Sequence, residues 1–252
     1  MSHASIQTVQ EYWDARPCNI RHSARPVGTR ECFDEVEQRK YFVEPHIPGF
    51  AEFARWSGKR VLEVGCGIGT DTISFARAGA HVTAVDLSGT SLALAASRAR
   101  LFGLAERIRF FQADAENLPD QVPLEEYDLV YSFGVIHHTP HPRKAIESIR
   151  QYMSPQSEAR LMIYAANSWK AAMIDAGFDQ PEAQSGCPIA RTYTPGEARE
   201  LLAGFEILEM RQDHIFPYVI EKYLRHEYEL QPWFKRMPVE MFRALERRFG
   251  WH

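Results

Sequence analysis

The clearest pattern in the chain is a series of short apolar runs, separated by amphipathic segments, that begins near Lys59. Short apolar runs bounded by turn residues are typical of buried strands, and longer segments with helical periodicity are typical of helices. The predicted strands cover residues 60–64, 81–86, 107–113, 127–133 and 160–164. The predicted helices between them cover residues 70–78, 90–102 and 143–152. This alternation indicates βαβ units and a largely parallel sheet.

Capping residues support the predicted helix starts. Thr70 or Asp71 is expected to cap the first helix, and Ser88 the second, because short polar side chains accept hydrogen bonds from the first free backbone N–H groups. Thr194 followed by Pro195 indicates one more helix start near the end of the regular region.

The regions before and after the alternating strands and helices have less regular patterns. Their bounds give the expected domain organisation. Residues 1–57, rich in aromatic and basic side chains, are predicted to form a helical lid in front of the main fold. The sheet domain is expected to span 58–214, with an insertion at 168–193 and a sixth strand at 205–210. Residues 215–252 are predicted to be a helical, aromatic tail of the same domain.

Composition narrows the class of protein. The 252 residues are 45% hydrophobic and 25% charged, values typical of globular domains. The net charge of −4 argues against nucleic acid as the main partner, and no apolar run approaches the length of a membrane span. The four cysteines are widely scattered. We therefore expect a cytoplasmic monomer or homodimer with a small-molecule substrate and with neither nucleic acid nor membrane as a partner.

The turn after the first predicted strand contains Glu63-x-Gly65-x-Gly67-x-Gly69. Glycines allow a tight turn and a close approach of a ligand to the backbone, and the following helix presents unpaired N–H groups. Such a turn alone is a weak signal, since nicotinamide dinucleotide binders use a similar one with the spacing Gly-x-Gly-x-x-Gly.

Acidic residues follow the next two predicted strands. Asp86 ends the second strand, where a carboxylate can accept both hydroxyls of a ribose, and Asp114-Ala115 follows the third, where an adenine edge would lie. Ligands of parallel sheets bind at the carboxyl ends of the strands. The three strand ends together therefore predict a nucleoside site.

With these motifs the chain resembles the class I S-adenosylmethionine-dependent methyltransferases, over roughly residues 56–167 and more loosely to about 210. The resemblance rests on four segments, which are Val61-Leu-Glu-Val-Gly-Cys-Gly-Ile-Gly-Thr70, Val85-Asp-Leu-Ser88, Gln112-Ala-Asp-Ala-Glu-Asn-Leu-Pro119 and Tyr127-Asp-Leu-Val-Tyr-Ser-Phe-Gly-Val-Ile-His-His-Thr-Pro140. It implies an α/β three-layer sandwich with a mostly parallel, seven-stranded Rossmann-like sheet in the order 3-2-1-4-5-7-6. The sheet has six strands if the last is missing, because the tail looks helical and the chain stops at Gly250-Trp251-His252.

The resemblance also assigns roles to matching positions. The three glycines would hold the methionine part of S-adenosylmethionine, Asp86 the ribose, and Asp114 and Ala115 the adenine. The predicted cofactor-binding residues are Glu63, Gly65, Gly67, Gly69, Thr70, Asp86, Leu87, Asp114, Ala115, Ser132, Phe133, Trp13 and Arg21.

The N-terminal segment 11–23 has two interpretations. It is either a helix that docks on the sheet through Tyr12 and Trp13, or a lid over the sulfonium. In the second interpretation aromatic faces lie near the positive sulfur and an arginine such as Arg21 binds the cofactor carboxylate.

The turn His137-His138-Thr-Pro-His141 suggests a metal site, but its histidines lack helical spacing and carboxylate or thiolate companions in sequence. We predict no metal. If the acceptor must lose a proton, the candidate bases are His137, His138, Tyr12 and Tyr41. The alternative is that these side chains only pack against their neighbours.

The sequence therefore predicts an enzyme that transfers a methyl group from S-adenosylmethionine to a small acceptor by in-line displacement. An alternative with the same cofactor is a cyclase of the azetidine-2-carboxylate synthase type. There the cofactor's own amine attacks its γ-carbon and releases methylthioadenosine. More distant alternatives are a nicotinamide-dependent oxidoreductase, which the glycine spacing disfavours, and a non-catalytic binding protein.

Overall fold

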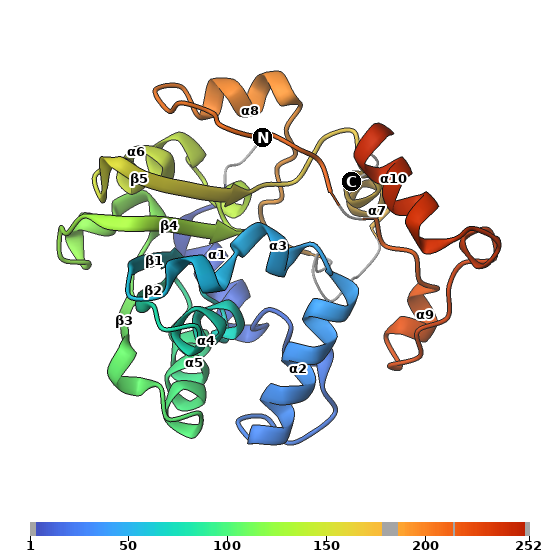
Figure 1. Ribbon diagram of the computed structural model, residues 1–252, viewed down its shortest axis with the longest axis horizontal. Coiled ribbons are helices and arrows are strands. Elements are labelled where there is room, and N and C mark those ends of the chain that lie inside the picture. The colour runs from blue at the N-terminus through green and yellow to red at the C-terminus, as the bar shows by residue number, and fades with distance from the viewer. Residues whose placement is uncertain (1–3, 178–185, 214, 250–252) are drawn as a thin grey trace.

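One parallel sheet lies at the centre of the molecule (Figure 1). The computed structural model describes residues 4–177, 186–213 and 215–249. Within them the strands run in the order β3-β2-β1-β4-β5, and every neighbouring pair is parallel. The strands are β1 (Arg60–Val64), β2 (His81–Asp86), β3 (Ile108–Gln112), β4 (Tyr127–Phe133) and β5 (Met153–Met162). This order matches the first five strands that the resemblance implies.

Helices cover both faces of the sheet, so the expected three-layer α/β arrangement is confirmed. The α-helices are α1 (Ile6–Ala15), α2 (Arg30–Val43), α3 (Ile47–Ala51), α4 (Thr70–Arg77), α5 (Gly89–Leu101), α6 (Pro142–Arg150), α7 (Trp169–Asp175), α8 (Pro195–Leu201), α9 (Ile220–Tyr223) and α10 (Val239–Phe249). Side chains alternate along a strand, and accordingly Val61 packs with α4 and α5 while its neighbour Leu62 packs with α6.

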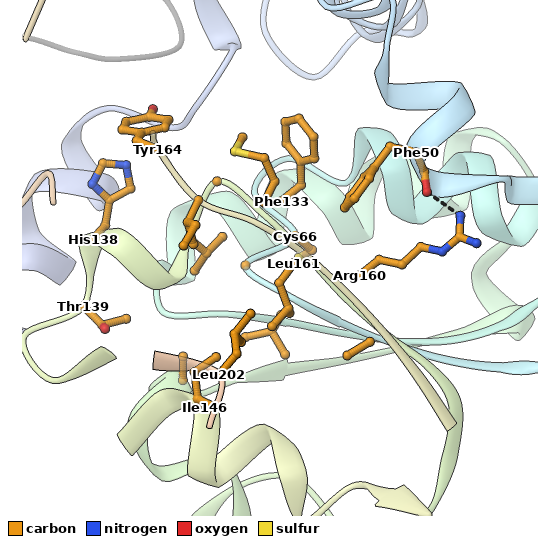
Figure 2. A pocket seen from close by; sticks show the side chains of 18 of the residues that line it. Phe50, Cys66, Phe133, His138, Thr139, Ile146, Arg160, Leu161, Tyr164 and Leu202 are labelled. Atoms are coloured by element: carbon orange, nitrogen blue, oxygen red, sulfur yellow. Dashed lines mark hydrogen bonds between the residues drawn. The ribbon is translucent and has the colours of Figure 1, made fainter. Parts of the chain in front are cut away.

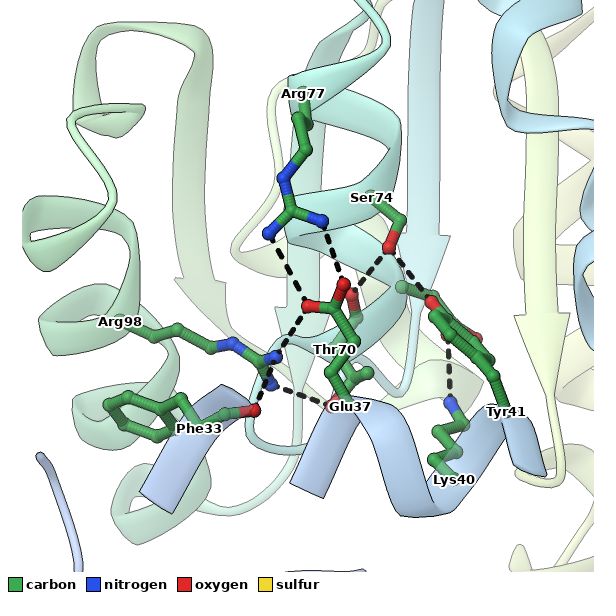
Figure 3. Close-up of polar contacts among 9 residues, drawn as sticks. Phe33, Glu37, Lys40, Tyr41, Thr70, Ser74, Arg77 and Arg98 are labelled. Carbon is green, nitrogen blue, oxygen red and sulfur yellow. Dashed lines mark hydrogen bonds and ion pairs between the residues drawn. The ribbon is translucent and has the colours of Figure 1, made fainter. Parts of the chain in front are cut away.

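Helix α2 holds the start of α4, directly after the glycine turn (Figure 3). Glu37 of α2 pairs with Arg77 at 2.7 Å and with Arg98 of α5 at 3.0 Å. The buried Arg98 also donates to the Thr70 hydroxyl at 2.7 Å and to the Phe33 carbonyl at 3.1 Å. A buried charge needs several partners, so these contacts fix the first turn of α4.

The tail is less helical than the sequence predicts. It has the helices α9 and α10, and an aromatic cluster in which Phe216, Tyr218 and Tyr223 pack with Val43 of α2. The cluster is anchored by Arg39, whose guanidinium lies 4.3 Å from the centroid of the Tyr223 ring. Packing of rings, rather than helical periodicity, therefore explains the aromatic residues of this segment.

The predicted caps are mostly confirmed. Ser88 accepts from the Ser91 N–H at 3.0 Å, and Thr194 forms a capping box with Glu197. The first turn of α4 differs, because its N-cap is Gly69 at φ 77° rather than Thr70 or Asp71. The left-handed backbone of a glycine already ends the turn there, one residue earlier than the prediction.

Strand β5 begins seven residues before the predicted start at 160. Its first seven residues, Met-Ser-Pro-Gln-Ser-Glu-Ala, are mostly polar and include Pro155, a pattern that does not resemble a buried strand. Proline is tolerated because β5 lies at the edge of the sheet, where one side of the strand makes no ladder.

The prediction of seven or six strands is wrong for the part of the chain that the structure describes, which has five. Residues 205–210 form no strand, since 206–209 are exposed and the Leu208 side chain is 78% exposed. Apolar alternation favours a strand, but a strand also needs a hydrogen-bonded neighbour. The proposed final strand at Gly250 and part of the insertion, 178–185, lie outside the described residues. Among the described helices, none has the length and apolarity needed to cross a membrane.

Candidate functional site

A cavity of about 1360 Å³ opens at the carboxyl ends of the strands (Figure 2). It is lined by residues at or just after the ends of β1, β2 and β3, namely Gly65, Asp86 and Asp114, and by Phe133 at the end of β4. Pockets for single small ligands have volumes of roughly 300–1,000 Å³. The volume is larger than this range because the cavity continues along the edge strand β5, where Met153, Ser157 and Glu158 also line it.

The three glycines of the turn have different tasks. A Cβ atom on Gly65 would lie 2.1 Å from Cγ2 of Val135, and one on Gly69 would lie 3.0 Å from Cβ of Ala95. A side chain at Gly65 would therefore clash with Val135, whereas Gly69 is in tight contact with Ala95 and is not a lining residue of the cavity in the described structure. Gly67, at φ 53°, would point a Cβ atom into open space and lines the cavity. Gly67 is therefore the glycine of this turn at which a ligand gains most from a missing side chain.

Asp86 lies beside this turn. Its two oxygens accept hydrogen bonds from the N–H groups of Gly67 at 2.7 Å and Ser88 at 2.8 Å. Burial raises the pKa of Asp86 to about 6. Each carboxylate oxygen keeps further acceptor capacity, so two ribose hydroxyls could still donate to it. Leu87 lines the cavity beside it.

Asp114 and Ala115 line the cavity where β3 ends. The Asp114 carboxylate accepts from the Glu116 N–H at 2.9 Å and the Asn117 amide at 3.2 Å, and burial raises its pKa. Thr70 also lines the cavity. These positions agree with a nucleoside lying across the ends of β1, β2 and β3.

Two of the predicted cofactor residues, Glu63 and Ser132, contact the elements around the turn and do not line the cavity in the described structure. The Glu63 carboxylate accepts from the Thr72 hydroxyl at 2.5 Å, and burial together with Asp71 raises its pKa to about 8. The Ser132 hydroxyl donates to the Val64 carbonyl at 2.9 Å. In the described structure Glu63 and Ser132 are not lining residues of the cavity. Their positions suit support of the turn and not direct contact.

A buried charged cluster, which the sequence pattern does not indicate, lies next to the turn. Asp71 accepts from the Lys40 ammonium at 2.8 Å and from the hydroxyls of Tyr41 at 3.0 Å and Tyr131 at 2.9 Å. Burial alone lowers the pKa of Lys40, but the carboxylates of Asp71 and Glu44 outweigh it and raise the pKa. Lys40 lines the cavity, and no feature of its polar sequence neighbourhood indicates that it is buried.

The N-terminal helix contributes to the cavity wall. Ile6, Val9 and Trp13 of α1 line it, and Tyr12 packs edge-on against Trp13 at 5.2 Å between ring centroids. Arg21 is exposed and is not a lining residue in the described structure. The structure therefore supports the cavity position of Trp13 and gives no support for Arg21 as the partner of the cofactor carboxylate.

Of the four candidate bases, His138 is the one that lines the cavity in the described part of the chain. His137 is fully buried, with its ring 3.7 Å from that of Tyr164, and burial holds its pKa well below the usual range. A tyrosine acts as a base only after losing its proton, and burial beside Asp71 raises the pKa of Tyr41 far above its usual range. The geometry therefore favours His138.

The histidine side chains of the turn 137–141 do not point toward one common site. The His141 ring pairs with Glu116 at 2.9 Å, while His138 contacts the Ile189 carbonyl at 2.5 Å. Within the described residues, no group of three His, Cys, Asp or Glu side chains has an arrangement suited to hold a metal ion.

The comparisons with known proteins agree with this geometry. Residues 61–156 match a methyltransferase domain. The ubiquinone biosynthesis O-methyltransferase of Aromatoleum aromaticum is 37% identical over 99 residues, which are 39% of this chain and 41% of the relative. The enzyme of the same name from Erwinia tasmaniensis is 30% identical over 63% of this chain and 64% of the relative. This chain thus matches less than two thirds of either relative.

A solved structure shows the same fold. Magnesium protoporphyrin IX methyltransferase from Synechocystis PCC 6803 with bound S-adenosylmethionine superposes with a TM-score of 0.56, at 17% identity, over 86% of this chain and 95% of that one. The family match therefore covers residues 61–156, and the likeness to this solved structure shows a shared fold.

Proposed function

We propose that this protein binds S-adenosylmethionine across the ends of β1, β2 and β3 and transfers its methyl group to a small molecule. The observation that carries the proposal is the alignment of three strand ends, where Gly67, Asp86 and Asp114 line one cavity. Gly67 leaves room for the methionine part, Asp86 accepts from the ribose and Asp114 meets the adenine.

The residues of the chain mainly align and enclose the reactants. The sulfonium supplies an already activated methyl group, so alignment and exclusion of water account for most of the required catalysis. Trp13 of α1 lines the cavity, and an aromatic face there would favour a positive sulfur. The names of the relatives support an oxygen atom of a small molecule as the acceptor.

The test is a calorimetric titration of S-adenosylmethionine into the wild-type protein and the variant Asp86→Asn. Hydrogen bonds to a charged group are worth about 1.5–3 kcal/mol, so the variant should bind about ten- to a hundredfold more weakly. Asp128→Asn is the matched control, because Asp128 caps the opposite end of the sheet through the Arg60 N–H at 2.8 Å. Equal affinity of all three proteins, or tighter binding of a nicotinamide dinucleotide, would overturn the proposed site.

A further inference from the structure

A buried lysine lies beside the glycine turn on the wall of the cavity. Lys40 of α2 lines the cavity, although its side chain is only 10% exposed. Its ammonium pairs at 2.8 Å with Asp71, the second residue of α4, and Figure 3 shows Lys40 next to the start of that helix. Nζ also lies 5.6 Å from the centroid of the Phe133 ring at the end of β4. Lys40 therefore belongs to the end of the cavity at which Gly67 leaves room for a ligand.

The Lys40 ammonium has hydrogen-bonding capacity that the described part of the protein does not use. An ammonium has three N–H donors, and one of them donates to Asp71. Asp71 is the hydrogen-bond partner of Nζ within the described ranges, and it also accepts from the hydroxyls of Tyr41 and Tyr131. Buried donors of a charged group without an acceptor are costly. The remaining donors of Lys40 therefore indicate an acceptor group on a ligand in the cavity.

The charge of Lys40 suits an anionic ligand group. Burial lowers the pKa of Lys40, but the carboxylates of Asp71 and Glu44 raise it, and the net change is a rise. The side chain is therefore an ammonium at physiological pH. Hydrogen bonds between an ammonium and a carboxylate are stronger than those between neutral groups.

Glu44 limits which anionic group fits. It follows Lys40 by four residues at the end of α2, is buried, and lines the same cavity. The charges of Glu44 and Asp71 disfavour a phosphate, which carries more negative charge than a carboxylate. They are compatible with one carboxylate at Lys40 and an ammonium group next to it. This combination is the head group of an α-amino acid, which is also the methionine end of S-adenosylmethionine.

We infer that Lys40 binds the α-carboxylate of S-adenosylmethionine and makes the site selective for a cofactor with that group. This inference rests on the proposed function and adds a specificity-determining residue to it. Lys40 takes the role that the sequence assigns to Arg21, which is exposed and is not a lining residue of the described cavity. Helix α2 thereby contributes to binding directly, with Asp71 holding the Lys40 side chain in place.

The experiment compares two ligands that differ in one group. S-adenosylmethionine and decarboxylated S-adenosylmethionine share the nucleoside, the sulfonium and the amine, and the second lacks only the carboxylate. Calorimetric titration of the wild-type protein should show binding of the decarboxylated ligand that is about tenfold weaker or more, because hydrogen bonds between charged groups are lost. The decarboxylated ligand carries one positive charge more. A cavity that selected ligands by its acidic side chains alone would therefore bind it more tightly.

The variant Lys40→Met removes the ammonium and keeps an apolar stem. It should bind S-adenosylmethionine about tenfold more weakly or worse, and bind the decarboxylated ligand as well as the wild type or better. The preference for the carboxylate should therefore disappear. Lys59→Met is the matched control, because Lys59 is exposed and pairs with Asp128 at 3.3 Å at the opposite end of the sheet. It should retain the wild-type preference.

A second variant covers a loss of stability in the first. Lys40→Met leaves the buried Asp71 carboxylate without its cation, which is expected to destabilise the fold. The double variant Lys40→Met with Asp71→Asn removes both charges and keeps an acceptor for the hydroxyls of Tyr41 and Tyr131. It should also lose the preference, while its affinity for the decarboxylated ligand shows that the nucleoside site is intact.

Three results would overturn the inference. They are equal affinity of the wild-type protein for the two ligands, tighter binding of the decarboxylated ligand, or a preference for S-adenosylmethionine that persists in either Lys40 variant. If the wild-type protein binds neither ligand, the proposed function itself fails. The same titration thus separates a wrong cofactor from a wrong carboxylate partner.

Discussion

At the scale of single residues, Asp86 connects the cofactor site to pH. The folded protein without ligand buries this carboxyl group and raises its pKa to about 6, although the N–H groups of Gly67 and Ser88 oppose the rise. Ribose hydroxyls that donate to the carboxylate would favour its charged form further. Binding should therefore be linked to the protonation state of Asp86.

We expect the affinity for S-adenosylmethionine to depend on pH. The bound state should have a lower pKa for Asp86 than the free state, so binding releases protons near and below pH 6. Affinity for S-adenosylmethionine should then be constant well above pH 6 and weaken as the pH falls through 6. Calorimetry at several pH values checks this, with Asp86→Asn as the control that loses the dependence. An affinity that increases toward pH 5 would contradict the assignment.

Single residues also show what the sequence can and cannot predict. Asp86 and Asp114 are predictable because strand ends of a parallel sheet meet at one edge. The burial of Lys40 depends on contacts with α4 and β4, which are distant in sequence, so no local pattern indicates it. Tyr164 likewise reaches the cavity only because β5 lies beside β4.

At the scale of elements, the glycine turn joins β1 to α4, and its glycines differ in whether packing or ligand binding requires them. Gly65 has φ 81° and faces Val135, while Gly67 has φ 53° and faces the cavity. A left-handed residue other than glycine costs roughly 1–2 kcal/mol at either position. The clash with Val135 adds a cost at Gly65 that Gly67 does not have.

We expect Gly65→Ala to lower the free energy of unfolding more than Gly67→Ala, by about 1–3 kcal/mol, the usual cost of overpacking. Gly67→Ala should keep more of the stability but bind S-adenosylmethionine more weakly, because its methyl group enters the cavity. Urea unfolding and calorimetry on both variants measure the two effects. Equal stability of the variants, with unchanged affinity in Gly67→Ala, would show that the turn does not work in this way.

Helix α1 is the second element with a testable role. Asp14 accepts from the Ser88 hydroxyl at 2.7 Å and from the Thr90 N–H at 3.1 Å, which ties α1 to the start of α5 beside Asp86. Trp13 on the same helix lines the cavity. A ligand at Asp86 would therefore lie close both to Trp13 of α1 and to the contact of Asp14 with Ser88.

If α1 is a lid, hydrogen exchange in residues 6–23 should slow when S-adenosylmethionine binds. The matched reference is α8, whose first turn is held by the capping box of Thr194 and Glu197. Its exchange should change little. Identical exchange of residues 6–23 with and without the cofactor would leave α1 as a fixed part of the scaffold.

Some secondary-structure elements can be predicted from the sequence and others cannot. The strands β1, β2 and β4 are predicted at their observed bounds because their apolar runs are continuous and end in turn residues. The polar start of β5 and the exposed segment 205–210 are mispredicted, since both depend on which strand edge has a partner. Pairing across the sheet is a property of the whole fold and is not encoded in a local pattern.

At the scale of the whole molecule, the strand ends, helix α1 and residues 204–213 line one open cavity of about 1360 Å³. The cofactor end and the wall around His138 belong to this cavity. Such an arrangement would bring a methyl donor and an acceptor together, and methyl transfer is the expected result.

The most direct test identifies the nucleoside product by mass. The purified protein is incubated with S-adenosylmethionine alone, and then with a panel of small phenols, amines, carboxylates and thiols. Methyl transfer predicts S-adenosylhomocysteine that accumulates with enzyme concentration when an acceptor is present and stays at background without one. Enzyme-dependent methylthioadenosine formed from S-adenosylmethionine alone would contradict methyl transfer and show that the bond to the γ-carbon breaks instead.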